Sequence, residues 1–101
     1  MLFERKETIV HQRRPRYSGE EAMKRGREWY RTVIRPKLQP RDKGKYVAID
    51  VETGDYAIDD DSLRATHVLI DRKPDAEVWM ERAGYLVVDS FAGRLPEDPE
   101  W

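Results

Sequence analysis

Six acidic side chains crowd a short stretch near the middle of the chain, and carboxylates are ligands that Mg²⁺ and Ca²⁺ prefer. They are Asp50, Glu52, Asp55, Asp59, Asp60 and Asp61. An EF-hand loop that began at Asp50 would need glycine at its sixth position and glutamate at its twelfth, where this chain has Asp55 and Asp61. Acids also favour turns and helix N-termini, where the helix dipole stabilises them. We therefore predict no metal site, and a metal-dependent enzyme using Asp50, Glu52 and Asp55 is a minor alternative.

Other catalytic patterns are missing from the sequence. His11 and His67 are the only imidazoles, and no serine lies in a nucleophile-elbow pattern. The six glycines form no G-x-G-x-x-G or Walker run, which argues against a phosphate cradle. The chain has no cysteine, so it has no thiol nucleophile and no thiolate metal site. We predict a non-enzymatic protein with no catalytic residue and no cofactor.

Basic side chains gather in the first half of the chain. Residues 1–45 hold 14 Lys and Arg against 6 Asp and Glu, whereas residues 46–101 hold 5 against 14. A basic stretch of this kind is most simply a solvated helix face with a frayed terminus. The functional alternatives are a phosphate-binding surface and a surface that meets an acidic partner. The candidate nucleic-acid-binding residues are Arg13, Arg14, Arg16, Lys24, Arg27 and Arg31.

Large aromatic side chains are the candidates for contact with a protein partner. Trp79 alternates with Val78 and Met80, so we predict that it emerges on the outer face of a sheet, where a large aromatic indicates an interface. Trp101 ends an acidic tail and is a candidate hook into a partner's groove, although a free terminus is the plainer interpretation. Tyr56 completes the predicted partner-binding set.

The composition indicates a small cytoplasmic domain with a thin core. The chain has 101 residues, enough for one domain, and 39% of them are charged, against about 25% in an average domain. The lack of cysteine fits a reducing compartment. No apolar run approaches the ~18 residues of a membrane span, and the first residues lack the apolar stretch of a secretory signal.

Spacing and capping signals predict the elements that position these side chains. Ser18 stands three residues before Glu21, a capping box, and an apolar face at helical spacing then predicts a helix that stops or kinks at Pro36. Alternation over 45–59 around Gly54 predicts a hairpin. Residues 59–62 predict a cap for a helix over about 62–72, and strands are expected over 76–82 and 85–91.

This order predicts an α+β fold in which an N-terminal helix precedes a ββαββ unit. We expect a four-stranded, mainly antiparallel sheet with strand order 2-1-3-4 and both helices on one face. Residues 1–17 are predicted to be a basic, loosely ordered arm, 18–92 a single domain, and 93–101 an acidic, extended tail.

The middle of the chain resembles a family of short uncharacterised bacterial proteins that is common in cyanobacteria. The family core runs RGKWVAID, TGDYE, DD, RRPDA and a glycine-containing hairpin, and this chain has GKYVAID from Gly44, TGDY from Thr53, Asp59-Asp60 and RKPDA from Arg72. The resemblance covers about residues 27–92 and implies a compact ββαβ unit behind an N-terminal helix. It also implies a small protein encoded beside a partner gene, and it supplies no catalytic residue.

Three functions follow as hypotheses. The first is a protein-interaction module, whose partner is a second copy of the chain or the product of a neighbouring gene, as in toxin–antitoxin pairs. The second is nucleic-acid binding through the basic arm and the first helix. The third is the metal-dependent enzyme already described. No membrane partner is expected.

Overall fold

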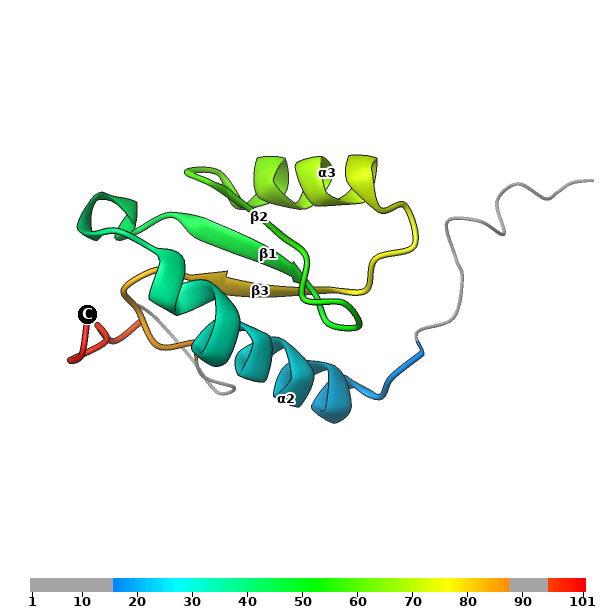
Figure 1. The fold of residues 1–101 in the computed structure, drawn as a ribbon, viewed down its shortest axis with the longest axis horizontal. Coiled ribbons are helices and arrows are strands. Elements are labelled where there is room, and N and C mark those ends of the chain that lie inside the picture. The colour runs from blue at the N-terminus through cyan, green and yellow to red at the C-terminus, as the bar shows by residue number, and fades with distance from the viewer. Residues whose placement is uncertain (1–15, 88–94) are drawn as a thin grey trace, which may run out of the picture.

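The computed structural model describes residues 16–87 and 95–101. Helix α2 spans Gly19–Trp29, strand β1 Tyr46–Asp50, strand β2 Tyr56–Asp59, helix α3 Ser62–Arg72 and strand β3 Val78–Arg82. The three strands form an antiparallel sheet in the order β2-β1-β3 (Figure 1). The fold is therefore α+β, as the sequence predicts. No helix in the described part of the chain is long and apolar enough to cross a bilayer.

Helix α2 begins and continues as its sequence predicts, but it does not stop cleanly at Pro36. The Ser18 hydroxyl caps it by accepting a hydrogen bond from the Glu21 amide at 3.1 Å. After Trp29 the helix widens into a π-helical turn over Tyr30–Ile34 and then tightens into a 3₁₀ turn over Arg35–Lys37. The proline sits in the 3₁₀ turn, where its missing amide hydrogen costs nothing.

The central hairpin and the second helix are confirmed. Val47 pairs with Ile58 and Ala48 with Ala57, and Gly54 makes the turn with a φ of +83°. This glycine also lies under the Trp29 ring, whose indole N–H donates to the Val51 carbonyl at 2.9 Å. Helix α3 is capped by Asp61, whose carboxylate accepts from the Leu63 amide at 2.8 Å.

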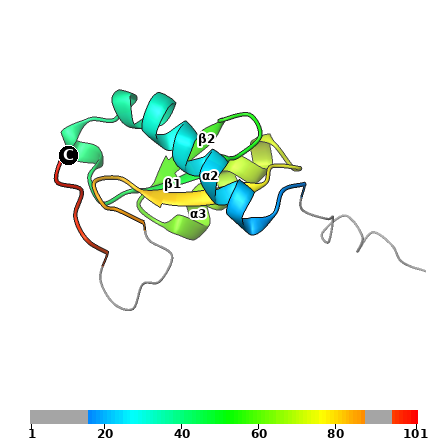
Figure 2. The same cartoon turned by 90° about the horizontal axis from the view of Figure 1, so that it is seen from below.

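The two helices lie on opposite faces of the sheet, so the prediction that both share one face is wrong. The first helical segment, which consists of α2 and the π-helical and 3₁₀ turns that continue it, packs on one face of the sheet. One cluster there joins Tyr30 and Ile34 of this segment to Val47 and Ile49 of β1. A second cluster joins Ala48 of β1 to Ala65 and Leu69 of α3. Figures 1 and 2 show the sheet between the helices. The physical reason is that small Ala48 and Ala57 form an apolar surface that a helix can approach closely.

The predicted fourth strand over 85–91 is not shown by the structure, and its residues 88–91 lie outside the described residues. Its first residues pair elsewhere. Tyr85 forms a bridge with Glu97, and the Leu86 amide donates to the Pro96 carbonyl at 2.9 Å. These contacts join the segment to the C-terminal tail rather than to β3.

Candidate functional site

The acidic side chains of the central hairpin stabilise turns and helix ends. Asp50 is 2% exposed, and its carboxylate accepts from the Glu52 amide at 3.0 Å and the Thr53 hydroxyl at 2.9 Å. Asp55 and Asp59 pair with Arg72 and Arg64 at 3.2 and 3.3 Å. Across residues 16–87 and 95–101, no group of three or more acidic or histidine side chains is placed to hold a metal ion.

The three aromatic residues predicted to bind a partner pack against their own domain. Tyr56 packs beside the cluster under α2. Trp79 points away from Val78 and Met80, as predicted, but that face carries α2, and the Trp79 ring lies against Gly26 of the helix. Trp79 is therefore half-buried rather than exposed on an outer face. The ring of Trp101 lies 5.9 Å from the Arg35 guanidinium.

The C-terminal tail is bound to the domain over its described residues, 95–101. The Asp98 amide donates to the Gly84 carbonyl at 2.9 Å, and the Asp98 carboxylate pairs with Arg35 at 3.0 Å. Glu97 pairs with Lys43 at 2.9 Å. The tail thus forms a wall of the domain, and Trp101 lines a small hollow together with Leu38.

The predicted nucleic-acid-binding residues do not share one setting. Arg13 and Arg14 lie outside the described residues. Arg16 pairs with Glu52 at 2.6 Å, and Arg31 pairs with Glu28 at 2.6 Å. Arg27 donates to the Val87 carbonyl at 2.7 Å, and Lys24 is exposed. Acidic neighbours thus offset the charge of two of these arginines, and nucleic-acid binding stays a prediction.

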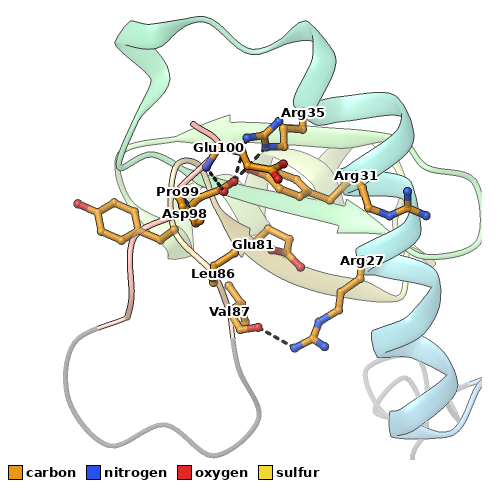
Figure 3. A pocket seen from close by; sticks show the side chains of 11 residues that line it. Arg27, Arg31, Arg35, Glu81, Leu86, Val87, Asp98, Pro99 and Glu100 are labelled. Atoms are coloured by element: carbon orange, nitrogen blue, oxygen red, sulfur yellow. Dashed lines mark hydrogen bonds and ion pairs between the residues drawn. The ribbon is translucent and has the colours of Figure 1, made fainter.

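A pocket of about 500 Å³ lies between the C-terminal half of the first helical segment, the end of β3 and the tail (Figure 3). Its lining carries three arginines and three acids, together with two tyrosines and a small apolar wall. These residues are Arg27, Tyr30, Arg31, Arg35, Glu81, Tyr85, Leu86, Val87, Asp98, Pro99 and Glu100. This volume is within the range of about 300–1,000 Å³ that small-molecule sites occupy.

Glu81 is a buried carboxylate in this pocket. It is 5% exposed, and its Oε2 accepts from the Trp79 indole N–H at 2.7 Å. Burial raises the pKa of the Glu81 carboxyl, while the Trp79 hydrogen bond and the charge of Arg27 act in the opposite direction. A buried acid whose pKa is raised in a pocket is a typical mark of a binding or catalytic position.

Tyr30 carries a buried hydroxyl that has no hydrogen-bond partner of normal geometry in the described part of the chain. Burial raises the pKa of Tyr30 to about 12, with the Glu81 charge adding to the increase and the Gly84 amide opposing it. The hydroxyl therefore stays protonated. Tyr30 also opens the π-helical turn, and π turns inside helices are frequent at functional sites. An unsatisfied buried hydroxyl of this kind calls for an explanation, because it costs stability.

Replacing Glu81 by glutamine is expected to remove a pH dependence of stability. Because the folded pKa lies above the unfolded value near 4.5, the folded chain binds more protons, and the wild type loses stability as pH rises through the folded pKa. Glu81→Gln keeps an acceptor for Trp79 and carries no charge. Chemical denaturation should find it more stable than wild type at pH 7, by about 1.4 kcal/mol per unit of pKa increase, and equally stable below pH ~4. A constant difference across this range would contradict the assignment.

A second candidate site is the outer edge of β3. The backbone groups of residues 77, 79, 81 and 83 form the hydrogen bonds that join β3 to β1. For example, the Val51 amide donates to the Glu77 carbonyl at 2.9 Å. The backbone groups of Val78 and Met80 therefore face outward, and within the described chain they have no hydrogen-bond partner. The edge of β2 differs, because Arg72 donates to the Tyr56 carbonyl at 2.5 Å.

The sequence carried a signal for Glu81 but none for Tyr30. Strict alternation places Glu81 on the same face of β3 as Trp79. A helix that covers Trp79 would therefore also cover the Glu81 carboxylate. Tyr30 reads as an ordinary core position, because sequence spacing does not reveal whether a hydroxyl finds a partner.

A scan against protein-family models, a search of curated proteins and a search of solved structures each found no match to this chain. The resemblance to short cyanobacterial proteins therefore stays a prediction.

Proposed function

We propose that this protein is a non-enzymatic interaction module that binds an extended segment of another protein along the open edge of β3. The observation that carries the proposal is the outward backbone of Val78 and Met80, which has no partner in the described residues. A strand edge with free amides and carbonyls is a template for one more strand. The edge of β2 is less suitable, since Arg72 already covers part of it.

The side chains around this edge favour an apolar segment with alternating pattern. On one face of the sheet, Val78 and Met80 are half-buried, because α3 packs mainly over β1 and β2. On the other face, Met23 and Trp79 line an open hollow beside the start of α2. Successive side chains of an added strand point to opposite faces, so one set would meet Val78 and Met80 and the other set would meet the hollow.

The partner strand is proposed to come from a different protein rather than from a second copy. Helix α2 rests directly on β3, as the contact between Gly26 and Trp79 shows. Two copies paired antiparallel through β3 would carry both α2 helices on the same face, about one strand spacing of ~4.8 Å apart. Helices pack at about 8–10 Å, so they would clash. The product of a neighbouring gene, in the cytoplasm, stays the expected partner.

The experiment selects binding peptides from a random library and compares them on two variants of one position. Val78→Pro removes the first outward amide of the strand, at a position where edge strands tolerate proline. Val78→Thr keeps that amide and a β-branched side chain. Selected peptides should lose about fivefold or more in affinity for Val78→Pro and bind Val78→Thr normally, since a lost backbone hydrogen bond at a fixed edge contributes about 1 kcal/mol or more.

Hydrogen exchange of the complex supplies a second measurement. The amides of Val78 and Met80 should become protected when a peptide binds, because they then donate across the new ladder. Peptides that bind both variants equally and leave these amides unprotected would rule out strand addition at β3.

A further inference from the structure

The pocket beside Tyr30 carries a second inference, which does not depend on strand addition at β3. We propose that it binds a small zwitterion of the α-amino acid class, with the ammonium group on Glu81 and Tyr30 and the carboxylate on Arg31. The buried Tyr30 hydroxyl, which has no hydrogen-bond partner of normal geometry among the described residues, and the buried Glu81 carboxylate both belong to residues that line the pocket. They offer a hydrogen-bond acceptor pair for a cation.

The balance of charge in the lining selects a ligand that carries both signs. A simple anion would approach Arg27 and Arg31 but would also meet Glu81 and the tail acids. A simple cation would meet three arginines. A zwitterion satisfies both, provided that its cation reaches the deeper Glu81 and its anion stays near the helix. Figure 3 shows Glu81 in the middle of the pocket, with Arg27 and Arg31 on α2 and its continuation.

Arg31 is the arginine best able to receive a carboxylate. Its pair with Glu28 joins two side chains that are 68% and 62% exposed, and exposed pairs of this kind contribute little. Arg31 can therefore exchange its partner at small cost. Arg35 is different, because its pair with Asp98 is mostly buried, at 28% and 13% exposure, and holds the tail in place.

The apolar wall of the pocket indicates that the amino acid has a large apolar side chain. The Leu86 side chain is 42% exposed, and few other large apolar side chains of the described residues are exposed to this degree. It lies beside Val87 and Pro99 in the lining. A leucine- or phenylalanine-like side chain would cover this wall and remove it from water.

The test measures binding of free leucine and phenylalanine to the full chain by calorimetry, together with their N-acetyl and carboxamide forms. The free amino acids should bind, and each blocked form should bind at least about tenfold more weakly, because each loses one charged hydrogen-bonding group. Glu81→Gln and Tyr30→Phe should weaken binding of the free amino acids. Tyr46→Phe, outside the pocket, should leave it unchanged.

Three outcomes would overturn the proposal. No binding of either amino acid at millimolar concentration would remove the site. Equal binding of the N-acetyl forms would mean that an anion is sufficient. Binding that Glu81→Gln and Tyr30→Phe leave intact would place the ligand elsewhere. Val78→Pro should bind amino acids normally, which separates this result from a failure of strand addition.

Discussion

Gly26→Ala is expected to lower the free energy of unfolding by about 2–3 kcal/mol, the range that overpacking of a filled site typically costs. A Cβ atom at Gly26 would lie 2.6 Å from the Trp79 Cβ, next to the backbone of β3. The near end of a side chain cannot swing away, so the helix or the strand must shift. The better helix propensity of alanine offsets only about 1 kcal/mol of this loss.

The matched control is Gly19→Ala in the first turn of the same helix. Apart from its chain neighbours and its own helix backbone, no described residue has an atom within 4 Å of a Cβ built at Gly19, so this change gains helix propensity without a clash. Thermal melts should show a decrease of roughly 10–20 °C for Gly26→Ala and little change or a small increase for Gly19→Ala. A Gly26→Ala protein as stable as the control would mean that α2 does not rest on Trp79.

A double-mutant cycle locates the clash. In a Trp79→Ala background, adding Gly26→Ala should cost less than it does in the wild type, because the closest contacts, with two indole carbons, are gone and only the contact with the Cβ atom remains. Additive effects would assign the loss to the helix alone. The cycle also tests the strand-addition proposal indirectly, since that proposal uses α2 seated on β3 to exclude a second copy.

The sequence predicted the local elements well because their signals are local. Ser18 and Asp61 cap the helices that they were expected to cap, and Gly54 makes the expected turn. These signals depend on a few neighbouring residues and on backbone geometry. The sheet order of the three observed strands also agrees with the expected neighbours.

The sequence did not predict which surfaces meet, because burial depends on residues far apart in the chain. Ala48 alternates with Val47 and Ile49, so it lies on the opposite side of β1, and the prediction of both helices on one face left one side of the sheet without a helix. Small side chains there instead receive α3. In the same way Trp79 was assigned to an exposed face, although the glycine that receives it is 53 positions earlier in the chain.

The tail shows the same limit. Its acids and prolines favoured an extended segment with Trp101 as a hook, yet its partners are Arg35, Lys43 and Gly84 of the domain. The separation of basic residues into the first half of the chain and acidic residues into the second half gave part of the information about the partners of the tail. Among the described residues, Arg16, Arg35 and Lys43 of the first half pair with acids of the second half, so part of the charge of each half is offset within the chain.

Tyr30→Phe is expected to stabilise the ligand-free protein while it weakens amino-acid binding. The Tyr30 hydroxyl is buried and has no partner of normal geometry, and such a group costs about 1–3 kcal/mol. Phenylalanine keeps the ring in the cluster with Ile34 and Val47 and removes the unsatisfied oxygen. The melting temperature should therefore increase by roughly 4–8 °C for each kcal/mol gained.

The two opposite effects identify a hydroxyl that is retained for binding rather than for folding. A hydroxyl that held the fold together would make Tyr30→Phe less stable, and one without any role would leave amino-acid affinity unchanged. Tyr46→Phe controls for the loss of a phenol outside the pocket, because Tyr46 lies on β1 beside Arg82. Natural sequences lose stability at functional positions, and a more stable Tyr30→Phe protein with weaker binding is the result that this pocket requires.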